Sequence, residues 1–108
     1  MAIKKKHDLG DSLPKFVYVF GKKIPVIITS LKDLHGDFNL ETNEIRISKD
    51  YDLESAKSTL FHECLHAALA ISGQNELLNE KREEALVRML EHAFAHSIDF
   101  DKLSLDKQ

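Results

Sequence analysis

Two histidines stand four residues apart in the stretch STLFHECLHAALAIS, residues 58 to 72, and a glutamate follows the first of them. In an α-helix, His62 and His66 lie one turn apart on one face, so their ring nitrogens can bind one tetrahedral zinc ion. Glu63 then lies about 80 degrees around the helix from their midpoint, where an exposed carboxylate can reach a metal-bound water. The pattern indicates a hydrolytic metal site; the alternative is a surface helix with two solvent-exposed histidines.

The segment that carries these residues has the pattern of an amphipathic helix. Apolar side chains recur at helical spacing over residues 53 to 72, Asp52 is suited to cap the start, and Gly73 stands where the helix would end. Six residues point within about 60 degrees of one direction, opposite the histidines: Leu60, Phe61, Cys64, Ala67, Ala68 and Ile71. Cys64 is therefore predicted to be a small buried side chain and not a metal ligand.

A catalytic zinc ion needs a third protein ligand and keeps one position for water. The pattern with a third histidine six residues after His66 is excluded, because Leu69 and Ser72 stand where it needs glycine and histidine. A second helix is predicted from Asn75 or Asn79 to about Ile98, and its acidic residues are Glu80, Glu83, Glu84 and Glu91.

Among these acids Glu83 is the first choice for the third ligand. It falls inside the apolar stripe of the second helix, where a carboxylate is costly unless a cation compensates it. Glu84 lies toward the edge of that stripe and is the alternate. Both could also be plain surface acids in a first helical turn, where the helix dipole favours negative charge. His92 and His96 point away from Glu83 and are interpreted as a solvated face.

The residues before the first helix read as strands. FVYVF at 16 to 20, Gly21 and KIPVIITS predict a hairpin, in which Pro25 places the second strand at an edge or beside a bulge. A second hairpin is predicted from Phe38–Leu40, a polar turn and the strand EIRIS, residues 44 to 48. The fold class is thus α+β, with a small antiparallel sheet followed by two helices.

Length and composition bound the possible functions. A chain of 108 residues with 43% hydrophobic residues forms a single domain, with flexible ends expected at about 1–12 and 99–108. The net charge of −3 predicts neither a nucleic acid nor a membrane as partner. The start MAIKKKHDLG lacks the apolar stretch of a signal peptide, and no segment is long and apolar enough to span a membrane, so a soluble cytoplasmic protein is expected.

Over roughly residues 36 to 90, the chain resembles the small gluzincin-like zinc metallopeptidases, including the ImmA/IrrE-like group and short bacterial and phage proteins related to it. The likeness rests on a glycine before a short hairpin, the strand EIRIS, TLFHECLHA and EKREEALVRML. It implies a minimal zincin fold, His62 and His66 as zinc ligands, Glu63 as general base and a glutamate of the second helix as third ligand. The chain has Ala85-Leu86 where many gluzincins have Ala-Asn or Ala-Asp after that glutamate.

Two functions follow from these residues. As an enzyme, the chain would hydrolyse peptide bonds of a protein or peptide substrate by a zinc-activated water, with Glu63 moving the proton. The substrate would lie extended beside EIRIS as an edge strand, and Tyr51 and His35 are candidates for stabilising the oxyanion. The alternative is a zinc-stabilised module that binds or regulates another protein without turnover, since 108 residues leave little chain to wall a cleft.

Overall fold

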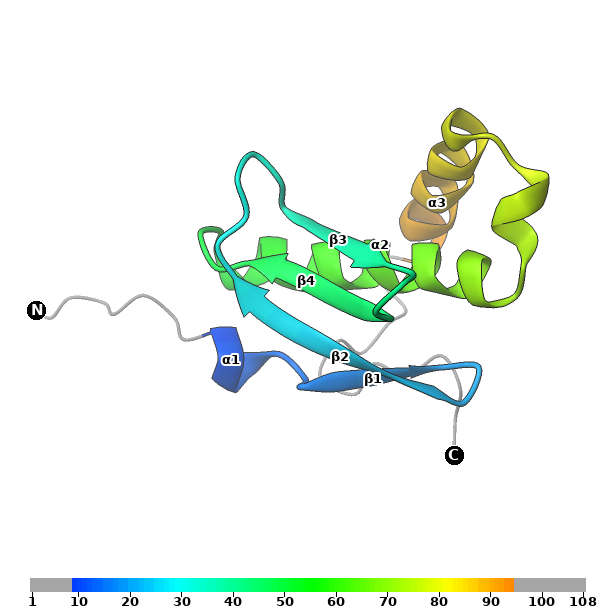
Figure 1. Cartoon of the computed structure of the whole chain (residues 1–108). Helices are drawn as coiled ribbons and strands as arrows, with labels where there is room; N and C mark the ends of the chain where they lie inside the picture. Colours follow the sequence, from blue (N-terminus) through cyan, green and yellow to red (C-terminus); the bar gives the residue numbers. More distant parts are fainter. Residues whose placement is uncertain (1–8, 95–108) are drawn as a thin grey trace, which may run out of the picture.

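The computed structural model describes residues 9 to 94 of the chain (Figure 1). The ends expected to be flexible lie outside the described residues, except for residues 9 to 12, which are helical and bury Leu9. The elements in chain order are α1 (Leu9–Ser12), β1 (Phe16–Val19), β2 (Lys22–Thr29), β3 (Gly36–Asn39), β4 (Glu44–Ser48), α2 (Leu53–Ile71), the 3-10 helix η1 (Gln74–Leu77) and α3 (Glu80–Phe94). The predicted α+β fold class is confirmed.

Four strands form one sheet in the order β1-β2-β4-β3. Both predicted hairpins are present as antiparallel pairs, β1 with β2 and β3 with β4. The central pair, β2 with β4, is parallel, so the sheet is mixed and not antiparallel throughout. The expectation that EIRIS is an edge strand was wrong: β4 lies between β2 and β3, and the edge strand next to the metal helix is β3.

Pro25 lies where β2 changes its partner. Residues 22 to 25 of β2 pair with β1, and residues 26 to 29 pair with β4. The absent N–H of Pro25 therefore falls at the point where one neighbour replaces the other, so an interior strand tolerates the proline. The first hairpin closes through Phe20 and Gly21, which both have positive φ, 50° and 77°, as a tight two-residue turn requires.

Helix α2 covers one face of the sheet and forms the core with it. Strands β2 and β4 point alternate side chains at the helix, and Ile24, Ile45 and Ile47 are fully buried there. The helix begins where Asp52 accepts a hydrogen bond from the Ser55 N–H at 2.8 Å, and it ends just before Gly73, which has a φ of 83°. The predicted start, end and core stripe of this helix are thus confirmed.

Helix α3 lies beside α2, away from the sheet (Figure 1). It starts later than the earlier of the two predicted positions, because residues 74 to 77 form η1 and the Asn79 side chain caps α3 by accepting from the Arg82 N–H at 2.8 Å. Only Val87 of α3 is fully buried. Glutamates 83, 84 and 91 of α3 instead face the histidines of α2.

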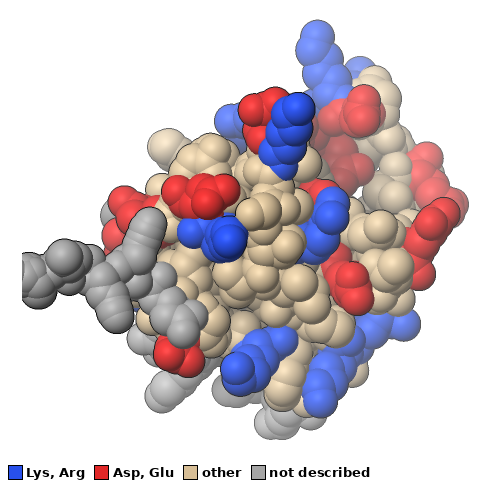
Figure 2. Space-filling view, turned by 60° about the vertical axis from the view of Figure 1, so that its left-hand side comes forward, with Lys and Arg blue, Asp and Glu red and all other residues tan. Residues whose placement is uncertain are grey.

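The described surface carries both signs of charge. Figure 2 shows acidic and basic side chains on the same face, with a band of uncharged residues between them. No helix within residues 9 to 94 is long and apolar enough to cross a membrane.

Candidate metal centre

The Nε2 atoms of both histidines face the carboxylate of Glu84. His66 Nε2 lies 3.1 Å from Oε1 of Glu84, and His62 Nε2 lies 3.4 Å from Oε2. One ligand atom from each of the three residues falls within a group whose members are all within 4.8 Å of one another. Two imidazole nitrogens and a carboxylate oxygen at such separations can hold a metal ion in common.

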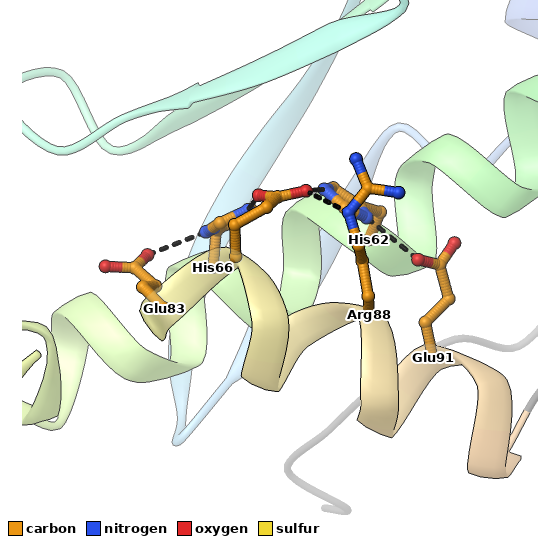
Figure 3. A network of polar contacts seen from close by, with 6 residues as sticks. His62, His66, Glu83, Arg88 and Glu91 are labelled. Carbon is orange, nitrogen blue, oxygen red and sulfur yellow. Dashed lines mark hydrogen bonds and ion pairs between the residues drawn. The ribbon is translucent and has the colours of Figure 1, made fainter. Parts of the chain in front are cut away.

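Each histidine is also held from its other ring nitrogen by a carboxylate of α3. Nδ1 of His66 lies 2.7 Å from Oε2 of Glu83, and Nδ1 of His62 lies 2.9 Å from Oε1 of Glu91 (Figure 3). A carboxylate that accepts from Nδ1–H fixes the tautomer in which Nε2 carries the free lone pair, and it makes that nitrogen a stronger ligand. Glu83 and Glu91 therefore point both Nε2 atoms at the same place.

The direction of α3 produces this arrangement. Along α2 the site runs from His62 to His66, whereas the α3 residues that meet them run from Glu91 back to Glu83. The two helices are therefore antiparallel at the site, and position 84 falls between the two histidines. Glu83, which sequence analysis favoured as the third ligand, is the more buried of the two acids, with 20% of its side chain exposed against 37% for Glu84. The partner that compensates its burial is the Nδ1–H of His66.

The carboxylates change the protonation of His66. Burial of the ring opposes its positive charge, but the hydrogen bond with Glu83 and the charges of Glu63, Glu83 and Glu84 outweigh that effect and raise the pKa of His66. A metal ion would replace the proton as the positive charge among these acids, since a ligating imidazole must be neutral.

Glu63 is buried and has no hydrogen-bond partner among the described residues. Only 7% of the residue is exposed, whereas sequence analysis expected an exposed side chain. Glu63 is less exposed than expected because β3 and α3 both pack against α2 and flank the Glu63 side chain. Burial raises the pKa of Glu63 to about 6, although the charges of His66 and His62 oppose this. No fully buried side-chain oxygen within residues 9 to 94 lacks a partner, so the carboxylate oxygens of Glu63 open to the cleft, where they can exchange a proton with a bound molecule.

A cleft between β3 and α3 contains these groups. It has two lobes of about 500 and about 540 Å³, and Gly36, Glu63 and Glu84 line both of them. One lobe runs toward the start of α2, past Thr59 and His62; the other runs toward its end, past His66 and Ala70. The candidate metal ligands therefore sit at the middle of a cleft that continues on both sides.

Gly36 allows β3 to approach α2 closely enough to form this cleft. A Cβ at this position would lie 2.7 Å from the backbone oxygen of Arg46 and 2.7 Å from Cγ2 of Thr59, nearer than atoms can pack. Thr59 stands three residues before His62, about one helical turn. Because Gly36 has no side chain, the edge strand can lie against the part of α2 that carries His62.

The other residues considered from the sequence lie apart from the candidate ligands. Cys64 is fully buried on the core side, and burial raises the pKa of its thiol to about 12, so it is a structural side chain as predicted. His92 is exposed, and His96 lies outside the described residues. The rings of His35 and Tyr51 pack against each other with centroids 4.0 Å apart and a tilt of 41°, and of the two only His35 lines the cleft.

One residue that sequence analysis overlooked joins the site. Nε of Arg88 lies 3.1 Å from Oε2 of Glu84 in an ion pair, and Arg88 lines the cleft (Figure 3). The spacing of Glu84 and Arg88, four residues apart on one helix, is a signal for such a pair. That signal becomes informative only once Glu84 is known to face the histidines.

Comparisons of the chain with protein-family models, with curated proteins and with solved structures found no match to any of them.

Proposed function

We propose that the chain is a zinc-dependent metallopeptidase of the gluzincin type, in which His62, His66 and Glu84 hold the ion and Glu63 is the general base. The observation that carries the proposal is the carboxylate of the largely buried Glu63, which has no hydrogen-bond partner among the described residues and lines the cleft together with the three convergent ligands. A purely structural zinc site closes its fourth position with a protein ligand and has no use for such a base.

The donor set favours zinc over harder ions. Two imidazoles and one carboxylate suit zinc, whereas magnesium and calcium prefer oxygen ligands alone. The described residues offer three ligands at this site. A three-ligand set leaves a position for water, as catalytic zinc sites require.

The chemistry divides between the ion and Glu63. A bound zinc ion would lower the pKa of a water molecule and polarise the carbonyl of the scissile bond. The Glu63 carboxylate accepts a proton from that water as the oxygen attacks the carbonyl carbon, and it then delivers the proton to the leaving amine. Glu83 and Glu91 hold the imidazoles in place and stay out of the proton transfer.

The edge of β3 is suited to bind the substrate backbone. The Ser48 N–H donates to the His35 carbonyl at 2.8 Å across the β3–β4 pair, so by the alternation of antiparallel pairing Gly36 and Phe38 turn their backbone groups away from β4. Gly36 and Phe38 both line the cleft. An extended peptide can pair with these groups as an added strand, which brings one of its peptide bonds over Glu63.

A library of internally quenched fluorescent peptides tests the activity. The protein is stripped with a chelator and reloaded with one equivalent of zinc, and His62→Ala serves as the control that cannot hold the ion. We expect cleavage that disappears with the chelator and returns with zinc in the wild type only. Zinc binding with no cleavage of any peptide would overturn the peptidase proposal and favour a binding module.

N-methylation of the best peptide, one amide at a time, tests the strand pairing. Alternate amides of an added strand donate to the edge of β3, so we expect methylation to lower kcat/KM at every second position near the cleaved bond. Equal effects at consecutive positions would contradict pairing with β3.

A further inference from the structure

A peptidase needs a hydrogen-bond donor for the oxygen of the scissile carbonyl, which gains negative charge as the water attacks. Nearly all charged groups that line the cleft are carboxylates, namely Asp37, Glu63, Glu80, Glu83, Glu84 and Glu91. These are acceptors when ionised and repel an oxyanion. Arg88 is the one lysine or arginine among the residues that line either lobe.

The guanidinium of Arg88 is held next to the candidate metal ligands. Its Nε lies 3.1 Å from Oε2 of Glu84 in an ion pair, and that same oxygen lies 3.4 Å from His62 Nε2. The guanidinium is thus one ion pair away from the place where the ligand atoms converge. In Figure 3 the terminal nitrogens of Arg88 point away from the backbone of α3.

Those terminal nitrogens remain available to a substrate. An arginine carries five N–H donors, and the contact with Glu84 uses the one on Nε. The Arg88 side chain is 71% exposed, so its outer end reaches the solvent that fills the cleft. The terminal N–H groups of Arg88 can donate to a substrate oxygen while Nε stays in contact with Glu84.

The two donors considered from the sequence are less suitable. Tyr51 is not among the described residues that line the cleft, and the ring of His35 packs against Tyr51. Neither makes a contact that the structure shows with a candidate ligand, whereas Arg88 forms an ion pair with Glu84.

We propose, on the basis of the peptidase function above, that Arg88 is a catalytic residue that donates from its terminal N–H groups to the developing oxyanion of the scissile carbonyl. No proton leaves Arg88: the guanidinium stays charged throughout, and the proton of the attacking water travels through Glu63 to the amine. The contact strengthens as charge builds on the oxygen, so it acts on the transition state more than on bound substrate.

Arg88→Ala and Arg88→Lys test this, with Arg82→Ala as the matched control, because Arg82 is an exposed arginine of the same helix that does not line the cleft. All proteins are assayed at saturating zinc on the library peptide that the wild type cleaves best. We expect Arg88→Ala to lower kcat by roughly 10² to 10³-fold with KM changed only a few-fold. Arg88→Lys should recover part of the loss, and Arg82→Ala should match the wild type.

A second measurement does not depend on turnover. A phosphonate version of the same peptide mimics the tetrahedral oxyanion, so Arg88→Ala should weaken its binding by about the factor lost in kcat. The uncleaved peptide should bind equally to Glu63→Gln and to the Glu63→Gln/Arg88→Ala double variant.

The outcomes separate this inference from the proposed function. The inference is wrong if the wild type cleaves peptides and Arg88→Ala keeps its kcat. It is also wrong if Arg88→Ala loses only zinc affinity, because Arg88 then only positions Glu84. In both cases the proposed peptidase function is retained. If the wild type cleaves no peptide, the proposed function and this inference fall together.

Discussion

Glu84 on α3 reaches both histidines of α2, with Oε1 3.1 Å from His66 Nε2 and Oε2 3.4 Å from His62 Nε2. Its neighbour Glu83 contacts only the opposite nitrogen of His66, at 2.7 Å. The two acids are adjacent in sequence, yet one faces the ligand atoms and the other faces away from them. They should therefore differ in their effect on metal binding.

Glu84→Gln is expected to weaken zinc binding more than Glu83→Gln. The first removes a ligand, whereas the second removes the outer partner of a ligand, which typically costs about 10 to 100-fold in affinity. Competition titrations with a zinc-sensitive chelating dye measure both. Glu76→Gln is the control, because Glu76 is an exposed acid shortly before the same helix and does not line the cleft. A larger loss in Glu83→Gln would show that Glu83 is the ligand, as sequence analysis first favoured.

Substitution within α2 should separate its two faces. We expect His62→Ala or His66→Ala to abolish binding of the single zinc ion, measured by mass spectrometry under native conditions. Cys64→Ala should keep zinc, since the thiol is fully buried on the core side, and should cost about 1 to 2 kcal/mol through a small cavity. Equal zinc content in the wild type and a double histidine variant, or loss of zinc in Cys64→Ala, would contradict this arrangement.

Gly36→Ala is expected to destabilise the protein by about 1 to 3 kcal/mol, because the added methyl overlaps Arg46 and Thr59. Urea unfolding measures the loss. The Thr59→Ser variant removes Cγ2, one of the two obstructing atoms, so the double variant should recover part of the stability. No change in Gly36→Ala would mean that β3 does not approach α2 as closely as the structure has it.

The buried Glu63 should make the stability of the metal-free protein depend on pH. Its folded pKa, about 6, lies above the ordinary value of 4.5, so the folded state binds the proton more tightly. The contribution of protonated Glu63 to the free energy of unfolding is complete below pH 4.5 and is lost as the pH rises through 6. We therefore expect Glu63→Gln to gain about 2 kcal/mol over the wild type between pH 4.5 and 7.5.

Urea unfolding of both metal-free proteins at the two pH values measures this gain. Glu54→Gln is the control, because Glu54 is an exposed acid on the same helix. A difference between wild type and Glu63→Gln that stays constant with pH would mean that Glu63 is not buried as a carboxylate.

Local signals in the sequence predicted α2 almost completely. Asp52 and Gly73 mark its ends, and the spacing of Leu60, Cys64 and Ala67 marks its buried face, since each depends on residues within a few turns. The same reasoning placed His62 and His66 away from the core.

Properties that depend on how elements meet were not predictable in this way. The parallel pairing of β2 with β4 makes EIRIS an interior strand, and no local pattern in EIRIS distinguishes that from an edge. The choice between Glu83 and Glu84 depends on the rotation of α3 against α2, and a change of one residue turns the helix by about 100 degrees. Burial of Glu63 likewise needs β3 and α3, which are distant from it in sequence.

The most direct test of the central claim compares zinc binding and peptide cleavage in the wild type and in Glu63→Gln. Glu63 is absent from the convergent ligand group, so the variant should bind one zinc ion as tightly as the wild type. It should also cleave the best library peptide about 10² to 10⁴-fold more slowly, the usual contribution of a positioned proton acceptor. Retained zinc with unchanged cleavage would contradict the role of Glu63 as base, and loss of zinc would show that Glu63 supports the metal instead.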